Sequence, residues 1–233
     1  MNTREKAVGQ KDDLAVRVFI YIILGILAIT IIIPVAWVFM ASIKQNKEFY
    51  GNPFALPEGV YLQNFVDAWT KARMGEYFMT SIMITALALA ILLVVALPAA
   101  YVLSRYKFVG RKWINNGFMA GLFINVNYIV VPIFLMFVSG DRILNKMFGH
   151  TFFLNNPFVV AVVLASTTLP FTIYLLSSYL ATLPKDYEEA AYVDGAGYFT
   201  TMVRIILPMA KPSIITVILF EFLAYWNEYI ISM

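Results

Sequence analysis

Long apolar runs constrain this chain more than any other feature of its sequence. A helix needs about 20 apolar residues to cross the roughly 30 Å hydrocarbon core of a bilayer. Five runs meet or approach that length, and we expect a spanning helix in each: residues 17–42, 78–104, 113–138, 158–181 and 212–232. The predicted fold class is an all-α polytopic membrane protein with five spanning helices.

The composition agrees with this prediction. Hydrophobic residues make up 61% of the chain, charged residues 13%, and the mean hydropathy is +0.76, far above what a water-soluble domain requires. The net charge of +3 comes from basic clusters between the apolar runs, which set topology, so no nucleic acid is expected as a partner. Cysteine is absent, and the single histidine, His150, is expected in an exposed loop, so no metal site is predicted.

Basic residues also predict the orientation. If alternate links lie on one side, eleven of the 17 Lys and Arg residues fall there, in the N-terminal tail and in the links after the second and fourth runs. The positive-inside rule then places the N-terminus in the cytoplasm. Five helices would leave the C-terminus outside, directly after an apolar run, so we expect a further helix to be missing after Met233.

The link between the fourth and fifth runs, residues 182–211, has an ordered pattern of its own. Pro184 suits the first turn of a helix, and acidic residues follow it near the positive end of the helix dipole. Gly195 is suited to stop that helix. The pattern predicts a helix of about three turns with Ala190 and Ala191 at its middle.

A second helical piece is expected after this glycine. Its 3.6-residue spacing predicts one apolar face, made of Phe199, Met202, Val203 and Ile206. We expect Pro208 to end this piece and Pro212 to begin the last spanning helix. The loop is therefore predicted as helix, glycine bend, helix and turn.

The loop matches the pattern Glu-Ala-Ala, three residues, Gly, nine residues, Ile-x-Leu-Pro. The matching residues are Glu189, Ala190, Ala191, Gly195, Ile205, Leu207 and Pro208. In this the chain resembles binding-protein-dependent ABC import permeases, whose cytoplasmic EAA loop forms a coupling helix that docks on an ATPase. The resemblance implies that role for residues 182–211, with ATPase coupling assigned to Glu188, Glu189, Ala190, Ala191, Asp194 and Gly195.

The chemistry of these residues fits docking. Ala190 and Ala191 allow close approach of a partner surface, and Glu188 and Glu189 can pair with basic residues there. The alternative is an amphipathic helix that lies on the membrane surface with ordinary acidic caps. The glycine and the Ile-x-Leu-Pro segment at matching spacing favour coupling, because each match needs a separate coincidence.

The resemblance extends over most of the chain. Residues 42–69, 169–197 and 226–229 are similar to carbohydrate-import permeases of the type of the shorter maltose permease subunit. This implies a bacterial plasma membrane protein that carries a sugar or oligosaccharide. It also implies that residues 1–233 are a single transmembrane permease domain lacking the last of six core helices.

The same resemblance implies partners: a second permease subunit, two cytoplasmic ATPase subunits and an extracellular solute-binding protein, in addition to membrane lipid. The sequence has no GxxxxGK[ST] phosphate loop, so ATP and Mg are expected on the ATPase, while this chain binds no cofactor and is not an enzyme. Import of an amino acid, peptide or ion stays open, as does a secondary transporter, although no internal repeat is visible.

Polar residues in the predicted spans are candidates for the substrate path. A charge at the bilayer centre costs about 2.5 to 3.5 kcal/mol, so such residues tend to face a bundle interior or a watery cavity. Glu221 and Glu228 lie seven residues apart, on nearly one face of the fifth helix. Trp226, Asn227 and Glu228 form the predicted substrate-path cluster. The alternative places Glu228 at the outer interface and Trp226 in the aromatic belt.

Asn125 and Asn127 of the third predicted helix are further substrate-path candidates. The alternative for both is a hydrogen bond between helices.

Overall fold

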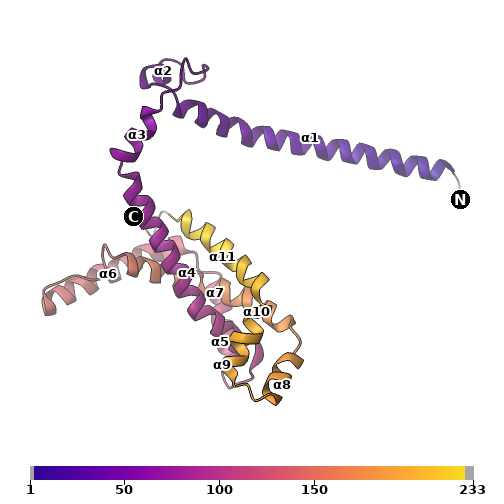
Figure 1. Ribbon diagram of the computed structural model, residues 1–233, viewed down its shortest axis with the longest axis vertical. Coiled ribbons are helices and arrows are strands. Elements are labelled where there is room, and N and C mark those ends of the chain that lie inside the picture. The colour runs from indigo at the N-terminus through magenta and orange to yellow at the C-terminus, as the bar shows by residue number, and fades with distance from the viewer. Residues whose placement is uncertain (1–2, 229–233) are drawn as a thin grey trace. The chain divides into compact units, whose positions relative to one another are not determined.

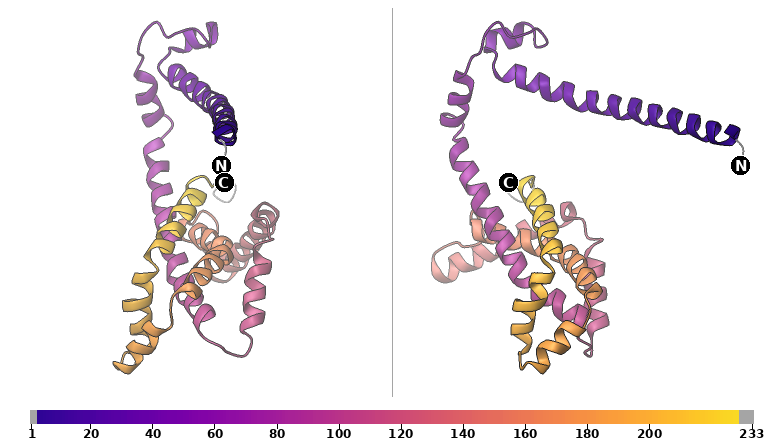
Figure 2. Two further views of the ribbon diagram at one scale, coloured as in Figure 1. Left: turned by 90° about the vertical axis from the view of Figure 1, so that its right-hand side faces the viewer. Right: turned by 45° about the vertical axis from the view of Figure 1, so that its right-hand side comes forward.

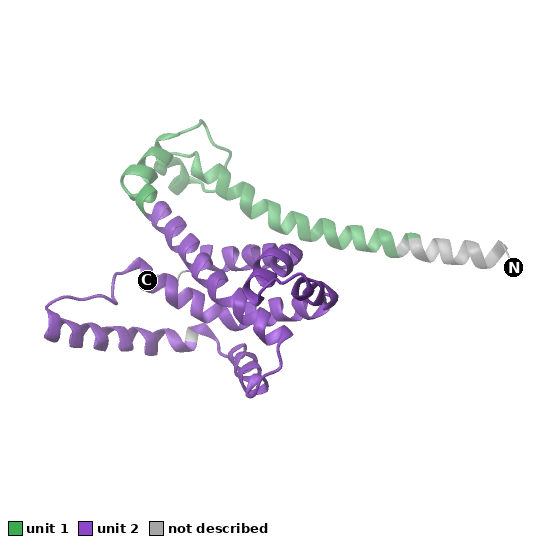
Figure 3. Cartoon of the chain, turned by 60° about the horizontal axis from the view of Figure 1, so that its bottom comes forward, with its two compact units in different colours: residues 1–76 green, residues 77–233 purple. Residues whose placement is uncertain are grey.

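The structure is a computed structural model that describes the backbone of residues 3–228 and the side chains of residues 14–228, apart from those of Ala15 and Asn127. Every regular element in the described part is a helix, which confirms the predicted all-α class. The chain divides into two compact units, residues 1–76 and 77–233, which we describe separately (Figure 3).

Within the described residues, four helices are long and apolar enough to cross a membrane by themselves. They are Val16–Ser42 within α1 (Thr3–Ser42), α4 (Met74–Arg105), Tyr128–Phe148 within α6 (Val126–Phe148) and α7 (Pro157–Thr182). A fifth candidate is a bent pair, Tyr198–Met209 followed by α11 (Lys211–Trp226), with a bend of 75° (Figures 1 and 2). The predicted last span continued to residue 232, but α11 ends at Trp226, and residues 229–233 lie outside the described part.

The prediction of one helix over residues 113–138 is wrong. The structure has two helices there, α5 (Arg111–Gly121) and α6, separated by residues 122–125. The N–H groups of residues 122–124 each donate to the carbonyl three residues earlier, so the end of α5 tightens and stops. α6 then continues to Phe148, through residues that we expected in a link.

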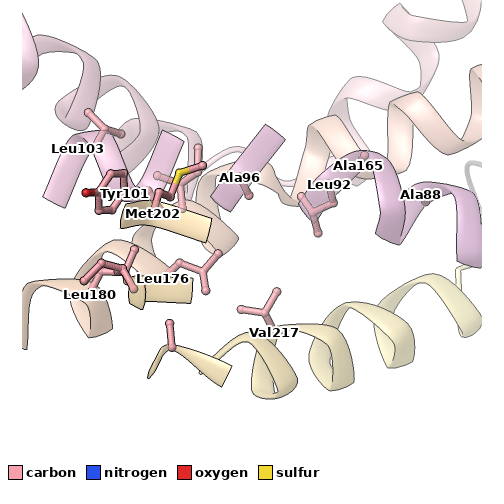
Figure 4. Packing of buried hydrophobic residues seen from close by; sticks show 14 of the residues in the cluster. Ala88, Leu92, Ala96, Tyr101, Leu103, Ala165, Leu176, Leu180, Met202 and Val217 are labelled. Atoms are coloured by element: carbon pink, nitrogen blue, oxygen red, sulfur yellow. The ribbon is translucent and has the colours of Figure 1, made fainter. Parts of the chain in front are cut away.

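The core of the second unit lies between α4, α7 and α11 (Figure 4). α4 contributes a buried stripe of mostly small residues, Ala88, Leu92, Ala96 and Ala100. α11 contributes a buried stripe at the same spacing, Ser213, Val217, Glu221 and Tyr225. Small side chains let the helices approach closely. α5 also approaches α7 closely, since a Cβ at Gly121 would lie 2.9 Å from Cγ of Pro170 on α7.

In the first unit, α1 is followed by two short helices, α2 (Asn46–Gly51) and α3 (Gln63–Thr70). Lys44 lies between α1 and α2 and is buried, and its ammonium donates to three backbone carbonyls, those of Asn52 and Pro53 at 3.2 and 3.3 Å and that of Ala55. This lysine therefore ties the segment after α2 to the end of α1.

The link between α6 and α7 is ordered by one carboxylate. Asp141 accepts the N–H groups of Phe152, Phe153 and Leu154 at 2.7 to 2.8 Å. The Phe153 ring also stacks on Phe137 of α6, with centroids 5.6 Å apart. His150 lies exposed in this link, as predicted.

Candidate functional site

The predicted loop begins with α8, Asp186–Val193. The helix starts two residues after Pro184, and its eight residues make just over two turns, which is shorter than the three turns predicted. Three carboxylates lie in its first turn, where the positive end of the helix dipole stabilises them: those of Asp186, Glu188 and Glu189.

Gly195 ends α8 as predicted. Its φ of +81° is a left-handed conformation that glycine adopts without a Cβ clash. The N–H groups of Gly195 and Ala196 donate to the carbonyls of Tyr192 and Ala191 at 3.1 and 2.9 Å, which is the Schellman pattern of helix ends. Asp194 is the C-terminal cap, and its N–H donates to the carbonyl of Ala190.

α8 has one open face and one packed face. The open face consists of exposed residues at helical spacing, Asp186, Glu189, Ala190 and Val193. We call it the open face of α8. The packed face contains Glu188 and Ala191, which are only 7% and 5% exposed. Of the two glutamates expected to pair with basic residues of a partner, Glu188 is therefore buried within this chain, while Glu189 is exposed.

Glu188 forms a buried ion pair with Arg105, the last residue of α4. Its Oε1 lies 3.3 Å from Nε of Arg105, and the two side chains are 9% and 3% exposed. The two groups are close but are not aligned as a hydrogen bond. Nη1 of Arg105 donates to the carbonyl of Leu183 at 2.9 Å, just before α8. One guanidinium thus holds both the start of α8 and its packed face.

Tyrosines make a second connection between α4 and α8. The Tyr106 hydroxyl lies 2.9 Å from that of Tyr192 on α8 and 3.2 Å from that of Tyr101 on α4. The Tyr198 ring packs edge-on against Tyr106 and Tyr192. Partial burial, together with the hydrogen bond to Tyr106, raises the pKa of Tyr192.

The second helical piece differs from the prediction in which of its apolar residues are buried. It consists of α9 (Tyr198–Thr201), the π-helix η1 (Met202–Ile206) and α10 (Leu207–Met209). Met202 and Ile206 are buried as expected, but Phe199 and Val203 are exposed. A π-helix has a wider turn than the 3.6-residue repeat assumed, which rotates the side chains.

The end of this piece also differs from the prediction. Pro208 does not end the helix, because α10 continues to Met209. Pro212 lies in the first turn of α11, as predicted.

The predicted substrate-path cluster falls at the end of α11. Trp226 is the last helical residue, and its ring packs edge-on against Phe78 and is stacked on Phe222. Asn227 is the C-terminal cap, and its amide donates to the carbonyl of Leu223 at 2.8 Å. Glu228 follows the helix and is partly exposed. It therefore does not continue the helical face of Glu221.

Glu221 lies inside the bundle and is only 3% exposed. Its Oε1 accepts the hydroxyl of Thr172 at 3.2 Å, and Oε2 has no hydrogen-bond partner among the described residues. One turn away, the hydroxyls of Thr168 and Tyr225 are hydrogen-bonded. These groups join α7 to α11, so the structure places Glu221 in helix packing.

The two asparagine candidates do not lie in one continuous span. Asn125 is an exposed residue of the break between α5 and α6, and Asn127 belongs to the first turn of α6.

Comparison with known proteins identifies the family. Residues 96–232, more than half of the chain, match the model of the binding-protein-dependent transport system inner membrane component. The chain belongs to this family. Family membership and the apolar helices together make it a multi-pass transport component of the bacterial inner membrane.

Relatives in the family include sugar permeases. The diacetylchitobiose uptake system permease protein NgcG of Streptomyces coelicolor is 34% identical over 206 residues, and the match covers 88% of this chain but 65% of that protein. The trehalose/maltose transport system permease protein MalG of Thermococcus litoralis is 28% identical over 225 residues, covering 96% of this chain and 77% of the relative.

A solved structure shares the fold. It is a bacterial ABC transporter involved in the import of the acidic polysaccharide alginate, with a TM-score of 0.77 at 24% identity, covering 94% of this chain and 73% of the other. The α8 to α10 loop lies within the region that matches the family model.

Proposed function

We propose that this chain is the transmembrane subunit of an ATP-driven ABC importer and forms part of the path of a sugar or oligosaccharide. The observation that carries the proposal is the open face of α8. It offers two carboxylates beside a small alanine and an exposed valine, while the opposite face is fixed to α4. The similarity to diacetylchitobiose and trehalose/maltose permeases supports a carbohydrate as the substrate class.

In this function, residues 182–211 are the cytoplasmic coupling loop, which places the N-terminus in the cytoplasm as well. Glu189 and Ala190 contact a partner ATPase, where the carboxylate pairs with a basic side chain. Glu188 and Ala191 act differently from the two partner-facing residues. They belong to the packed face, and Glu188 transmits the movement of α8 to α4 through its buried ion pair with Arg105.

A second route leads from α8 to the substrate path. Beyond the Gly195 bend, η1 contacts α8, and α10 leads through the 75° bend into α11. α11 packs on α7 through Glu221 and Tyr225, and it carries Trp226 and Asn227 at its end. A movement of α8 toward the ATPase therefore pulls on both α4 and α11, and this moves the end of α11, where Trp226 and Asn227 lie.

The remaining parts of the proposed importer are separate protein chains. Two cytoplasmic ATPase subunits bind ATP and Mg, a second permease subunit completes the path, and an extracellular binding protein delivers the solute. Import of an amino acid, peptide or ion is the alternative within the same family.

Reversing one charge on the open face tests this function. Glu189→Lys is expected to release the ATPase during purification and to abolish ATP-driven uptake of a labelled oligosaccharide, while Glu189→Gln keeps the ATPase bound more weakly. Membrane insertion of both variants should equal that of the wild type. Full uptake by Glu189→Lys would overturn the docking role, and uptake of a labelled amino acid in place of the sugar would overturn the substrate class.

A further inference from the structure

A groove lies beside the coupling loop, where α4, α5 and α7 meet. It encloses about 980 Å³ and is lined by the end of α4, the link to α5, the start of α5 and the last turns of α7. We call it the α4–α5 groove. We propose that it binds the phosphate head group of an anionic phospholipid.

The charge of the groove favours an anion. Lys107, Arg111 and Lys112 line it, and none of its described lining residues is Asp or Glu. Neither lysine belongs to a salt bridge of the described residues. Each cation close to an anionic lipid surface adds about 1 kcal/mol of attraction, so three of them in one groove select for a phosphate head group.

One of these cations is held in place before any ligand binds. Nε of Arg111 donates to the carbonyl of Leu103 at 2.8 Å, and Nη2 donates to that of Ser104 at 3.4 Å. The guanidinium is thereby fixed at the end of α4, and the ordering of this side chain is not a cost that the ligand must meet. Asn115 and Asn116 add amide donors to the same groove.

The groove also lies at the depth of a lipid head group. It is formed where two candidate spans end, α4 at Arg105 and α7 at Thr182. At its rim Val109 is fully exposed and Trp113 is 84% exposed. Trp side chains gather at the boundary between head groups and acyl chains, and an exposed valine there is covered by lipid.

The apolar surface next to the groove favours a lipid over free phosphate as the ligand. No residue of α5 is buried in this chain, and Tyr174 of α7 and Met119 of α5 line the groove with part of their surface open. Acyl chains that lie along this surface add hydrophobic contact that a soluble phosphate lacks. The groove therefore suits a ligand with a charged head and apolar tails.

Lipid binding can be measured by native mass spectrometry on protein purified in mild detergent with its accompanying subunits. The probe is dioleoyl phosphatidylglycerol, compared with dioleoyl phosphatidylcholine, which has the same chains but no net charge. We expect retained phosphatidylglycerol on the wild type and about thirtyfold weaker binding in the variant Lys107→Gln/Lys112→Gln, which loses two of the three cations. The variant Lys107→Arg/Lys112→Arg should bind normally, which guards against a mere folding defect.

The matched control is Lys47→Gln/Lys146→Gln, which removes two exposed lysines that lie outside both the groove and the coupling loop. Its lipid binding should equal that of the wild type. Equal loss in this control, equal retention of phosphatidylcholine, or no bound phosphatidylglycerol because a subunit covers the groove would each overturn the proposal. Displacement of the lipid by millimolar inorganic phosphate would assign the groove to a soluble anion instead.

Discussion

Breaking the ion pair between Arg105 and Glu188 should destabilise the protein strongly. Replacing one partner leaves the other charge buried, since the two side chains are only 3% and 9% exposed. Such a loss costs about 3 to 5 kcal/mol for buried pairs. We expect about 3 kcal/mol for Arg105→Met or Glu188→Met, at the lower end of that range, because the 3.3 Å contact is not an aligned hydrogen bond.

Thermal unfolding in detergent, followed by tryptophan fluorescence, measures this cost. At about 2 to 4 °C per kcal/mol for a chain of this size, each single variant should unfold roughly 6 to 12 °C below the wild type. The double variant Arg105→Met/Glu188→Met should recover most of the loss, because an apolar pair leaves no buried charge. Glu189→Gln, on the open face, should change the midpoint very little.

Two results would refute this reasoning. If the single variants unfold at the wild-type temperature, Glu188 is not held by Arg105. If the losses of the two single variants simply add in the double variant, the side chains are not coupled.

Three further changes test other parts of the account. Gly195→Ala should cost about 1 to 2 kcal/mol from its φ of +81° alone and lower uptake per ATP, whereas Gly197→Ala, at φ −77°, should leave both unchanged. Glu221→Gln should keep uptake and thermal midpoint, because an amide can accept the same hydroxyl; lost uptake at unchanged stability would instead put the carboxylate in the path. Lys44→Met should remove the ammonium that ties residues 52–55 to the end of α1 and speed proteolysis of that segment; an unchanged cleavage rate would contradict the anchoring role.

The spans and the end of α8 could be predicted because local physics decides them. Apolar length fixes a spanning helix, and a glycine at a helix end fixes a left-handed turn. The break at residues 122–125 was missed because a run of apolar residues does not reveal where hydrogen bonds tighten to the three-residue pattern. The π-helix was missed for a similar reason, since periodicity analysis assumes a constant turn.

The candidate site was predicted by its residues but not by its orientation. Glu188 and Glu189 are adjacent and chemically alike, so only the packed structure distinguishes the inward carboxylate from the outward one. Arg105 was counted only as a topological charge. Its pairing with Glu188 is indicated in the sequence only by its position at the end of a span, on the same predicted side of the membrane as the acidic loop.

Site-specific cross-linking tests the docking of α8 on an ATPase most directly. The chain has no cysteine, so a single introduced thiol reports one position without a background. Ala190→Cys on the open face should form a disulfide or a short bifunctional cross-link to the ATPase subunit. Ala191→Cys, one residue away but only 5% exposed, should not. An equal yield at both positions, or none at Ala190, would contradict the proposed docking face.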